Sequence, residues 1–551
     1  MTSARNTPQT EKAHRDQRKN NAGGYSFVVD KWCRLERFLI LGAEGGTYYV
    51  NQRKLVRDNF TSLQECLDED GVKTVEKIVE ISHGGRAPKN DAAIFALAVA
   101  AGHDSVKTKH AALEAMPKVC RIGTHLFDFL SCAQEFRGWG RGLRRAVAEW
   151  YLNKDAHKLG LQVAKYRQRN GWTHRDVLRK CGGEVYGDTH QAILRWVVSG
   201  IDGMGERTVK RGDSVKVYPA LDPESLPRII LGYEKAKAAS SAREAAQIVR
   251  DFRLTHEMVP SEFLKSKDVW DALLESMPIG ALVRNLGRLT ANGNLEAFSE
   301  GQKLAVAKLT DPVAIKKSRL HPLGVLKALK QYAMGQGGKG KLTWKPQAKV
   351  STALEDAFYL AFDAIEPTGK NIVAALDVSG SMGGLNNAGF EGWCAGMEGI
   401  SPMCAAAAMA MVTVRSEPNH EIQAFSHTLV PVDITERDRL ATVVQKMGRI
   451  PMGGTDCSLP MKWAMQGKIP VDAFYVYTDS ETWAGRNGHP HQVLEQYRQK
   501  MGRDAKLVVV GMTATDVSIA NPNDPGMLDV VGFDTSAPAV MADFTRQGYG
   551  R

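Results

Sequence analysis

The sequence predicts two domains of different architecture, an all-helical solenoid followed by an α/β domain with a parallel sheet. The 551 residues are too many for one compact core. Helical periodicity with short Gly, Pro, Asn or Asp breaks runs to about residue 346, and short apolar runs then alternate with helices. We therefore expect a disordered basic tail at 1–24, a helical domain at 25–366 and the α/β domain at 367–551.

The first part of the chain combines a polar tail with amphipathic helices. Residues 1–24 contain almost no large apolar side chains, which predicts disorder. Helices of moderate length with short breaks indicate stacked helix pairs, an α-solenoid. Apolar residues at i, i+3, i+4 spacing predict helices at 92–101, 142–152, 156–168, 190–198, 269–277 and 323–332.

The α/β pattern begins where a helix over 351–365 ends at Glu366-Pro367-Thr368-Gly369. Continuously apolar strands between helices are typical of a parallel sheet covered on both faces. Strands are expected at 371–376, 421–426, 473–477, 506–511 and 528–532, and helices at 403–415, 436–447, 458–466, 490–501 and 538–545.

Five oxygen-bearing side chains follow strands or precede helices in this second half. Asp377, Ser379 and Ser381 form a D-x-S-x-S sequence after the first strand, Thr455 lies before a helix, and Asp479 follows another strand. Such oxygens suit a hard divalent cation, and Mg²⁺ is the expected one. The set resembles the adhesion-type metal site of von Willebrand factor A domains. The alternative is a group of ordinary helix caps and turn residues.

Positive charge is concentrated in the helical half. Residues 1–350 hold 57 Lys and Arg against 38 Asp and Glu, a net of +19, whereas residues 351–551 hold 15 against 23, a net of −8. A basic field attracts polyanions, of which nucleic acid is the commonest. The alternative is a solvated basic face with tryptophans in the core. The candidate RNA-binding residues are Arg137, Arg141, Arg144, Arg145, Lys165, Arg169, His174, Arg175, Arg179 and Lys180.

Several functions are disfavoured by what the sequence lacks. It contains no nucleophile elbow, no H-E-x-x-H and no phosphate-binding P-loop, so we expect that the protein is not an enzyme. Eight scattered cysteines without a C-x-x-C pair, and the absence of a secretory signal, favour a cytoplasmic protein. The longest apolar stretch, 403–412, is too short to span a membrane. Cys457 is expected to be buried at a helix start, and His489 and His491 to be a solvated pair.

Several longer sequence runs resemble the Ro autoantigen family, the TROVE-domain RNA-binding proteins, including its bacterial orthologues. These runs are LGAEGGTYY at 41–49, VCRIGTHLF at 119–127, KYRQRNGW at 165–172, LVRNLG at 282–287, GGTDCSLPM at 453–461 and GFDT at 532–535. The resemblance implies a ring of HEAT-like helical repeats closed by a Rossmann-like von Willebrand factor A domain, in a protein expected to be a monomer.

The same resemblance implies a function. Family members bind a small structured Y RNA on the outer basic surface, and single-stranded 3′ ends of misfolded noncoding RNA enter the central hole. Bacterial relatives tether a 3′ exoribonuclease through the Y RNA and act in RNA turnover and stress survival. Lys165 and Arg169, four residues apart and so expected on one helix face, match basic positions of the family, whereas LRKCG at 178–182 departs from its vertebrate members. The alternative function is a metal-dependent protein-adhesion module on an incidental basic platform.

Overall fold

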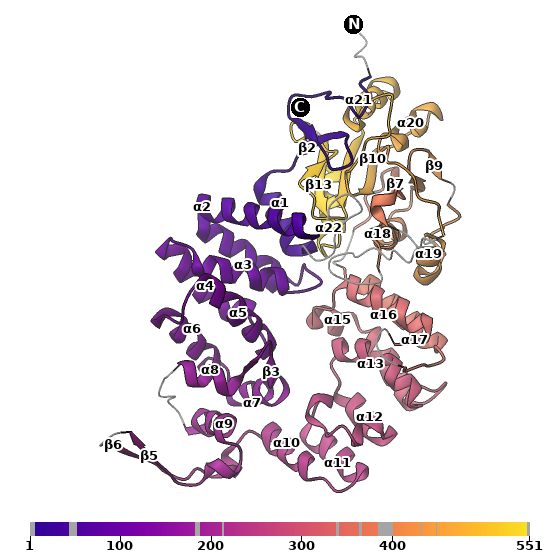
Figure 1. The fold of residues 1–551 in the computed structure, drawn as a ribbon. Coiled ribbons are helices and arrows are strands. Elements are labelled where there is room, and N and C mark those ends of the chain that lie inside the picture. Colours follow the sequence, from indigo (N-terminus) through magenta and orange to yellow (C-terminus); the bar gives the residue numbers. More distant parts are fainter. Residues whose placement is uncertain are drawn as a thin grey trace.

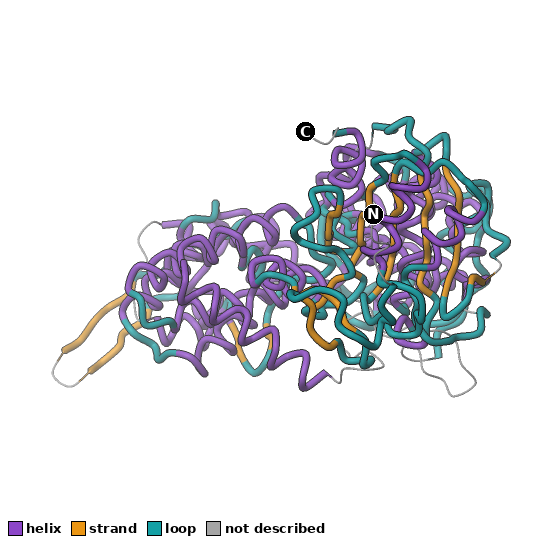
Figure 2. The backbone as a smooth tube through the Cα atoms, turned by 90° about the horizontal axis from the view of Figure 1, so that it is seen from above, coloured by secondary structure: helices purple, strands orange, loops and turns teal. Residues whose placement is uncertain are grey.

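Helices form a ring that an α/β domain closes at the top in this computed structural model (Figure 1). Viewed from above, helices extend to one side of the α/β domain, and the hairpin of β5 (Arg207–Arg211) and β6 (Ser214–Tyr218) projects from their far end (Figure 2). The described residues are 6–42, 52–181, 188–211, 214–337, 341–362, 366–383, 400–430, 432–447 and 449–547.

The helical half runs down one side of the ring and up the other (Figure 1). Its first helices are α1 (Lys31–Leu41), α2 (Gln52–Gly84), α3 (Asp91–Gly102), α4 (Val106–Val119), α5 (Gly123–Phe136), α6 (Arg141–Leu152), α7 (Ala156–Lys165), α8 (His174–Cys181) and α9 (Asp188–Ser199). The return side contains α10 (Arg228–Ala238), α11 (Ala242–Phe252), α12 (Lys267–Ser276), α13 (Ile279–Ala291), α14 (Glu300–Leu309), α15 (Pro312–Ser318), α16 (Pro322–Met334) and α17 (Ala348–Leu360). The predicted solenoid is confirmed.

Two small hairpins interrupt the helices. The first pairs β3 (Gln168–Arg169) with β4 (Trp172–Thr173), and the second pairs β5 (Arg207–Arg211) with β6 (Ser214–Tyr218). The sequence analysis predicted neither of them. The first hairpin follows directly on α7, so this helix ends at Lys165 and not at residue 168.

The α/β domain has a six-stranded sheet in the order β13-β11-β10-β7-β8-β9, parallel except at β9. Alternate side chains of β7 enter two cores: Ile372 and Leu376 pack with the helix α18, whereas Val373 packs with α20 and α21. Both faces are therefore covered, which explains why β7, β10 and β11 are buried along their whole length. The elements are β7 (Ile372–Asp377), α18 (Pro402–Ser416), β8 (His420–Phe425), β9 (Leu429–Val430), α19 (Leu440–Met447), α20 (Leu459–Gln466), β10 (Ala473–Thr478), α21 (Pro490–Met501), β11 (Lys506–Gly511), β13 (Met527–Val531) and α22 (Ala537–Arg546).

The N-terminal segment, residues 6–28, is folded onto the α/β domain. Strands β1 (Gln17–Lys19) and β2 (Tyr25–Val28) form a sheet with β12 (Val517–Ser518). The expected disorder of residues 1–24 is therefore wrong for residues 6–24. The physical reason is that Gln9 and Gln17, 0% and 3% exposed, are buried through hydrogen bonds rather than apolar contacts. A composition-based argument does not register this kind of burial.

Ion pairs join the start of the helical half to the α/β domain. Arg37 is 1% exposed, and its Nη2 donates to both carboxylate oxygens of Asp529 at 2.6 and 2.7 Å. Arg86 donates to Asp534, with Nη2 2.6 Å from Oδ2. Both pairs are largely shielded from solvent, with the arginines 1% and 18% exposed, and removing one partner of such a pair is destabilising. They hold one end of the solenoid against the α/β domain.

His321 joins the other end of the solenoid to the same place. Its Nδ1 accepts the backbone N–H of Leu323 and thereby caps α16. Its Nε2 lies 2.8 Å from the carbonyl oxygen of Phe533 and 3.1 Å from that of Arg86. Burial lowers the pKa of His321 to about 4, so its ring is neutral at this site. Through this contact the second end of the helical ring also meets the α/β domain.

Candidate metal centre and nucleic-acid interface

The five predicted metal ligands come together at one edge of the parallel sheet. Asp377 ends β7, and Asp479 directly follows β10, the neighbouring strand. Ser379 and Ser381 continue from β7, and Thr455 lies in the loop before α20. All five side chains are at most 3% exposed. The topology thus gathers side chains from three loops at the carboxyl ends of adjacent strands.

Hydrogen bonds orient part of this set. The Oδ1 of Asp377 accepts the backbone N–H of Ser379 at 2.9 Å, and its Oδ2 accepts the hydroxyl of Thr478 at 2.6 Å. The hydroxyls of Ser379 and Ser381 are 3.1 Å apart. Asp479 Oδ1 accepts the backbone N–H two residues ahead at 3.0 Å. Both carboxylate oxygens of Asp377 therefore accept a hydrogen bond, and the two bonds fix the orientation of the group.

Two oxygens of the set are buried and have no hydrogen-bond partner among the described residues. They are Thr455 Oγ1 and Asp479 Oδ2. A buried carboxylate oxygen without a donor is costly, and a cation would satisfy it. Among the described residues no group of three or more His, Cys, Asp or Glu side chains has metal-binding geometry. A cation here would therefore depend on the hydroxyl oxygens as well as the two carboxylates.

Negative charge is crowded at this edge of the sheet. Burial, together with the Asp479 carboxylate, raises the pKa of Asp377 to about 7. Burial also raises the pKa of Asp479. Glu481, which the sequence analysis overlooked although it lies two residues beyond Asp479, has its pKa raised to about 7 by burial and by that neighbour. The donor set and its charge fit a divalent cation.

Cys457 and His489 lie near the metal loops. Cys457 is 0% exposed, and burial raises the pKa of its thiol well above the usual value, so the expectation of an inert buried cysteine is confirmed. The expectation of a solvated histidine pair is wrong, because His489 is 0% exposed. Its ring contacts Gln17 at 3.1 Å and the Glu11 carbonyl at 2.9 Å, so it holds the N-terminal segment.

Exposed arginines and a lysine cover the neighbouring helices α6 and α8. Arg141, Arg144 and Arg145 lie three and four residues apart and so share one face of α6. Only the last of these pairs with a described carboxylate, Glu149 at 2.9 Å. Lys180 of α8 lies 5.3 and 5.5 Å from the ring centroids of two tryptophans at 172 and 139. In the described part of the chain this surface therefore offers cations without a carboxylate partner, and one of them, Lys180, lies beside aromatic rings.

A cavity of about 1140 Å³, here called the α8 pocket, adjoins this surface. Among the described residues its lining contains one carboxylate, Glu234, which pairs with Lys237 at 2.8 Å. Tyr233 accepts a hydrogen bond from one of the arginines at 2.7 Å. The cationic side chains that line the pocket are Arg167, Arg175, Arg179, Arg207 and Lys237.

Lys165 and Arg169 do not share a helix face, contrary to the expectation. α7 ends at Lys165, and Arg169 lies in β3 beyond it. The Lys165 side chain is 11% exposed, with Nζ 3.7 Å from a carboxylate oxygen of Glu257. Arg169 Nε lies 2.7 Å from Asp128. The two cations therefore face different carboxylates, and an RNA phosphate would have to compete with both.

Two further candidates have structural contacts. His174 is 2% exposed, and its Nδ1 lies 2.8 Å from the hydroxyl of Tyr151. Burial lowers the pKa of His174 to about 4, so the ring is neutral and cannot act as a surface cation. His174 nevertheless lines the α8 pocket, so its RNA contact stays a prediction, although the ring brings no positive charge. Arg137 is half-buried and donates to the carbonyl oxygen of Ala101 at 2.9 Å, which leaves only part of its guanidinium available.

Comparison with known proteins identifies the family. Residues 371–545 match the Ro60 vWA domain, and residues 18–202 and 251–332 match the TROVE domain. The RNA-binding protein RO60 of Deinococcus radiodurans is 41% identical, covering 98% of this chain and 97% of that protein. The chain belongs to the Ro60 family. The RNA-binding protein RO60 of Caenorhabditis elegans is 32% identical over 97% of this chain and 91% of its own length.

The Ro60 fold is also found in a solved structure. The crystal structure of the Deinococcus radiodurans RO (RSR) protein has a TM-score of 0.66 at 40% identity and covers 94% of this chain and 99% of that chain. The TROVE match leaves out residues 203–250. Arg207 and Lys237 of the α8 pocket lie in that gap, whereas its other three cations lie inside the matched stretch. Of the sequence run at 41–49, residues 43–49 lie outside the described residues.

Proposed function

We propose that this Ro60-family chain is an RNA-binding scaffold without catalytic activity of its own. A small structured RNA of the Y type would bind the outer basic surface, and single-stranded 3′ ends of misfolded noncoding RNA would enter the central hole. The observation that carries the proposal is the α8 pocket, in which five cations face one carboxylate. The relatives named RNA-binding protein RO60 support it.

The physical basis is attraction between phosphates and unpaired guanidinium groups. Arg175 and Arg179 lie one helical turn apart on α8, so both can meet phosphates of one RNA strand. Lys180, the next residue of α8, projects from a different side of the helix and lies near two tryptophan rings. Such contacts fix the position of an RNA and make its affinity depend on salt, because phosphate binding releases counterions.

The remaining parts of the proposal concern the cellular role. The scaffold would act in RNA quality control or turnover and stress survival in the cytoplasm, as a monomer. A 3′ exoribonuclease would be tethered through the bound Y-type RNA. Among the described residues, no helix is both long and apolar enough to cross a bilayer.

The test uses the purified full chain. We expect copurifying RNA, seen as a high ratio of absorbance at nucleic-acid wavelengths, and after its removal tight binding of a small structured RNA that weakens steeply with salt. Labelled RNA incubated with the protein and Mg²⁺ is expected to keep its full length. Protein that never binds RNA at low salt would refute the scaffold, and metal-dependent cleavage would refute the absence of catalysis.

We further propose that the loops at the sheet edge hold a divalent cation, Mg²⁺, through Asp377, Ser379, Ser381, Thr455 and Asp479. The two unpartnered buried oxygens support this assignment. A bound cation would neutralise the crowded carboxylates and leave a position for an acidic group of a partner. Isothermal titration of the metal-stripped chain with Mg²⁺ or Mn²⁺ tests it, and no heat of binding for either ion would refute it.

A second candidate function follows from that metal site, namely metal-dependent adhesion to an acidic protein partner. The same unpartnered oxygens favour it. Its distinguishing result is capture of an acidic protein in Mg²⁺ but not in EDTA by chain that carries no RNA. RNA in the captured complex after nuclease-free purification would favour the scaffold instead.

A further inference from the structure

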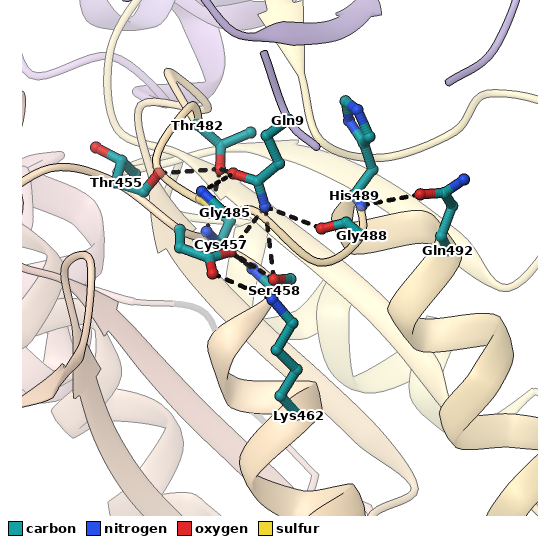
Figure 3. Close-up of polar contacts among 11 residues, drawn as sticks. Gln9, Thr455, Cys457, Ser458, Lys462, Thr482, Gly485, Gly488, His489 and Gln492 are labelled. Atoms are coloured by element: carbon teal, nitrogen blue, oxygen red, sulfur yellow. Dashed lines mark hydrogen bonds and ion pairs between the residues drawn. The ribbon is translucent and has the colours of Figure 1, made fainter. Parts of the chain in front are cut away.

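Gln9 is inserted between two loops of the α/β domain (Figure 3). Its side chain is 0% exposed although it belongs to the polar N-terminal segment. The amide nitrogen donates to Asp456 Oδ1 at 2.7 Å and to the Gly488 carbonyl at 3.2 Å. The amide oxygen accepts the hydroxyl of Thr482 at 2.6 Å and the backbone N–H of Gly485 at 3.1 Å. One side chain thus satisfies four groups.

The two loops that Gln9 bridges each carry a proposed metal ligand. The loop after β10 carries Asp479, and the loop before α20 carries Thr455. Asp456 directly follows Thr455, and Thr482 lies three residues beyond Asp479. The loops also contact each other, since the carbonyl oxygen of Thr455 accepts backbone N–H groups at 2.8 and 2.9 Å from residues 484 and 483. Gln9 therefore adds a side-chain bridge to a direct backbone contact between the same loops.

Only a side-chain amide of the length of glutamine provides both the donor and the acceptor that this position requires. The site requires a donor toward the Asp456 carboxylate and an acceptor toward Thr482, at opposite sides of one planar group. A carboxylate in its place would set a second negative charge against Asp456. A thioether of equal length would leave the carboxylate and the hydroxyl without these partners.

The rest of the N-terminal segment supports the loop that follows Asp479. Asn20 donates its amide to the Thr482 carbonyl at 2.9 Å, and the Ser26 hydroxyl donates to the Ser480 carbonyl at 3.0 Å. Gly24 lies so close that a Cβ there would be 1.9 Å from the Thr482 oxygen. The segment is thus fitted closely against this loop, and its contacts do not depend on Gln9 alone.

We infer that Gln9 is a positioning residue of the metal centre, through which the N-terminal segment sets the spacing of the Thr455 and Asp479 loops. The inference rests on the proposed divalent-cation site. Residue 9 lies outside both family matches, since the TROVE match begins at residue 18 and the Ro60 vWA match at residue 371. The metal centre of this chain therefore includes a part that neither family domain contains.

The test measures Mn²⁺ affinity by electron paramagnetic resonance on the full chain after metal removal. Gln9→Met keeps the length of the side chain and removes its hydrogen bonds, and Gln9→Glu removes the donor and sets a negative charge against Asp456. Both are expected to weaken Mn²⁺ binding about 10- to 100-fold, the usual effect of losing an outer-shell contact. Lys12→Met, an exposed position of the same segment, is the matched control and should bind like the wild type.

Thermal unfolding in EDTA distinguishes positioning from a purely structural role. Positioning predicts that Mn²⁺ raises the Tm of the wild type more than that of Gln9→Met. A variant that unfolds earlier in EDTA yet binds Mn²⁺ with wild-type affinity would overturn the inference while leaving the metal site intact. Equal weakening by Lys12→Met would overturn it as well. Wild-type protein that binds no Mn²⁺ would overturn both the metal site and this inference.

Discussion

Replacing both arginines of α8 that face the α8 pocket, Arg175→Ala with Arg179→Ala, should sharply weaken binding of a small structured RNA. Neither guanidinium has an ion-pair partner among the described residues, so each is free to meet a phosphate. A charge-assisted hydrogen bond contributes about 1.5 kcal/mol. The two together give about 3 kcal/mol, which corresponds to an affinity loss of about 10²-fold.

Salt dependence provides the second readout of this double variant. Each lost phosphate contact should reduce the slope of log K against log salt by about one, so the double variant should lose about two. Fluorescence anisotropy between about 50 and 200 mM salt measures both quantities. The matched control, Arg437→Ala with Arg486→Ala, removes the same charge from exposed positions of the α/β domain. A wild-type slope in the pocket variant, or an equal loss in the control, would refute the reasoning.

Four other outcomes are expected. Lys165→Ala with Arg169→Ala should weaken the same RNA less than about tenfold, because each cation already faces a carboxylate that screens it; a larger loss in the anisotropy assay would contradict this. The pKa of the buried His321 is lowered to about 4 in the folded protein, whereas an unfolded histidine titrates at about 6.5. Between these pH values only the unfolded chain binds the proton, so stability is lost as the pH falls. We expect this group to make the wild type about 2 kcal/mol less stable at pH 5 than at pH 7. In urea titrations, the stability that His321→Asn loses between pH 7 and pH 5 should be smaller than the wild-type loss by that amount. Arg37→Ala should lower stability by about 3 kcal/mol, the lower end for a buried pair, since it leaves the Asp529 carboxylate, 17% exposed, without its partner; denaturation like that of the wild type would exclude the interdomain role. Asp479→Asn should abolish the rise in Tm that Mg²⁺ gives the wild type while RNA affinity stays unchanged, and a variant still stabilised by Mg²⁺ would contradict the ligand set.

The α/β half was predictable because its signals are local. Each strand there is a short apolar run, and every predicted strand and helix overlaps an observed one. The rule that carboxyl ends of parallel strands meet at one edge predicted that Asp377 and Asp479 lie at the same side of the sheet, whereas the adjacency of β7 and β10 and the position of Thr455 came only from the structure. Asp377 and Asp479 follow adjacent strands β7 and β10, so their proximity was implied once the sheet order was right.

The misplacement of Lys165 and Arg169 came from a turn signal that was present in the sequence. Asn170 and Gly171 have φ values of 49° and 75°, the left-handed conformations of a tight hairpin turn. Asn-Gly is the strongest dipeptide signal for such a turn. Lys165 and Arg169 were assigned to one helix because they are four residues apart, although the Asn170-Gly171 turn directly follows Arg169. Turn chemistry would have ended α7 at the observed place.

Other errors could not have been avoided from one sequence. Gln9 contacts residues more than 440 positions away, and its burial depends on hydrogen-bond partners from three different loop positions. Arg37 meets Asp529 at a separation of 492 residues. A polar side chain carries no hydrophobic signal, so periodicity cannot reveal that it is buried. Only the assembled fold shows which polar groups find partners.

The opposite charges of the two halves serve two separate purposes, and ionic strength should separate them. The net +19 of residues 1–350 and the net −8 of residues 351–551 direct polyanions to the helical half. The same complementarity holds one end of the ring, since Arg37 and Arg86 from the basic half meet Asp529 and Asp534 of the acidic half. Exposed cations are screened within a Debye length of about 10 Å at 0.1 M salt, whereas buried pairs are screened much less. Rising salt should therefore release RNA well before it opens the ring, and loss of both in the same salt range would show that the interdomain pairs are not buried in solution.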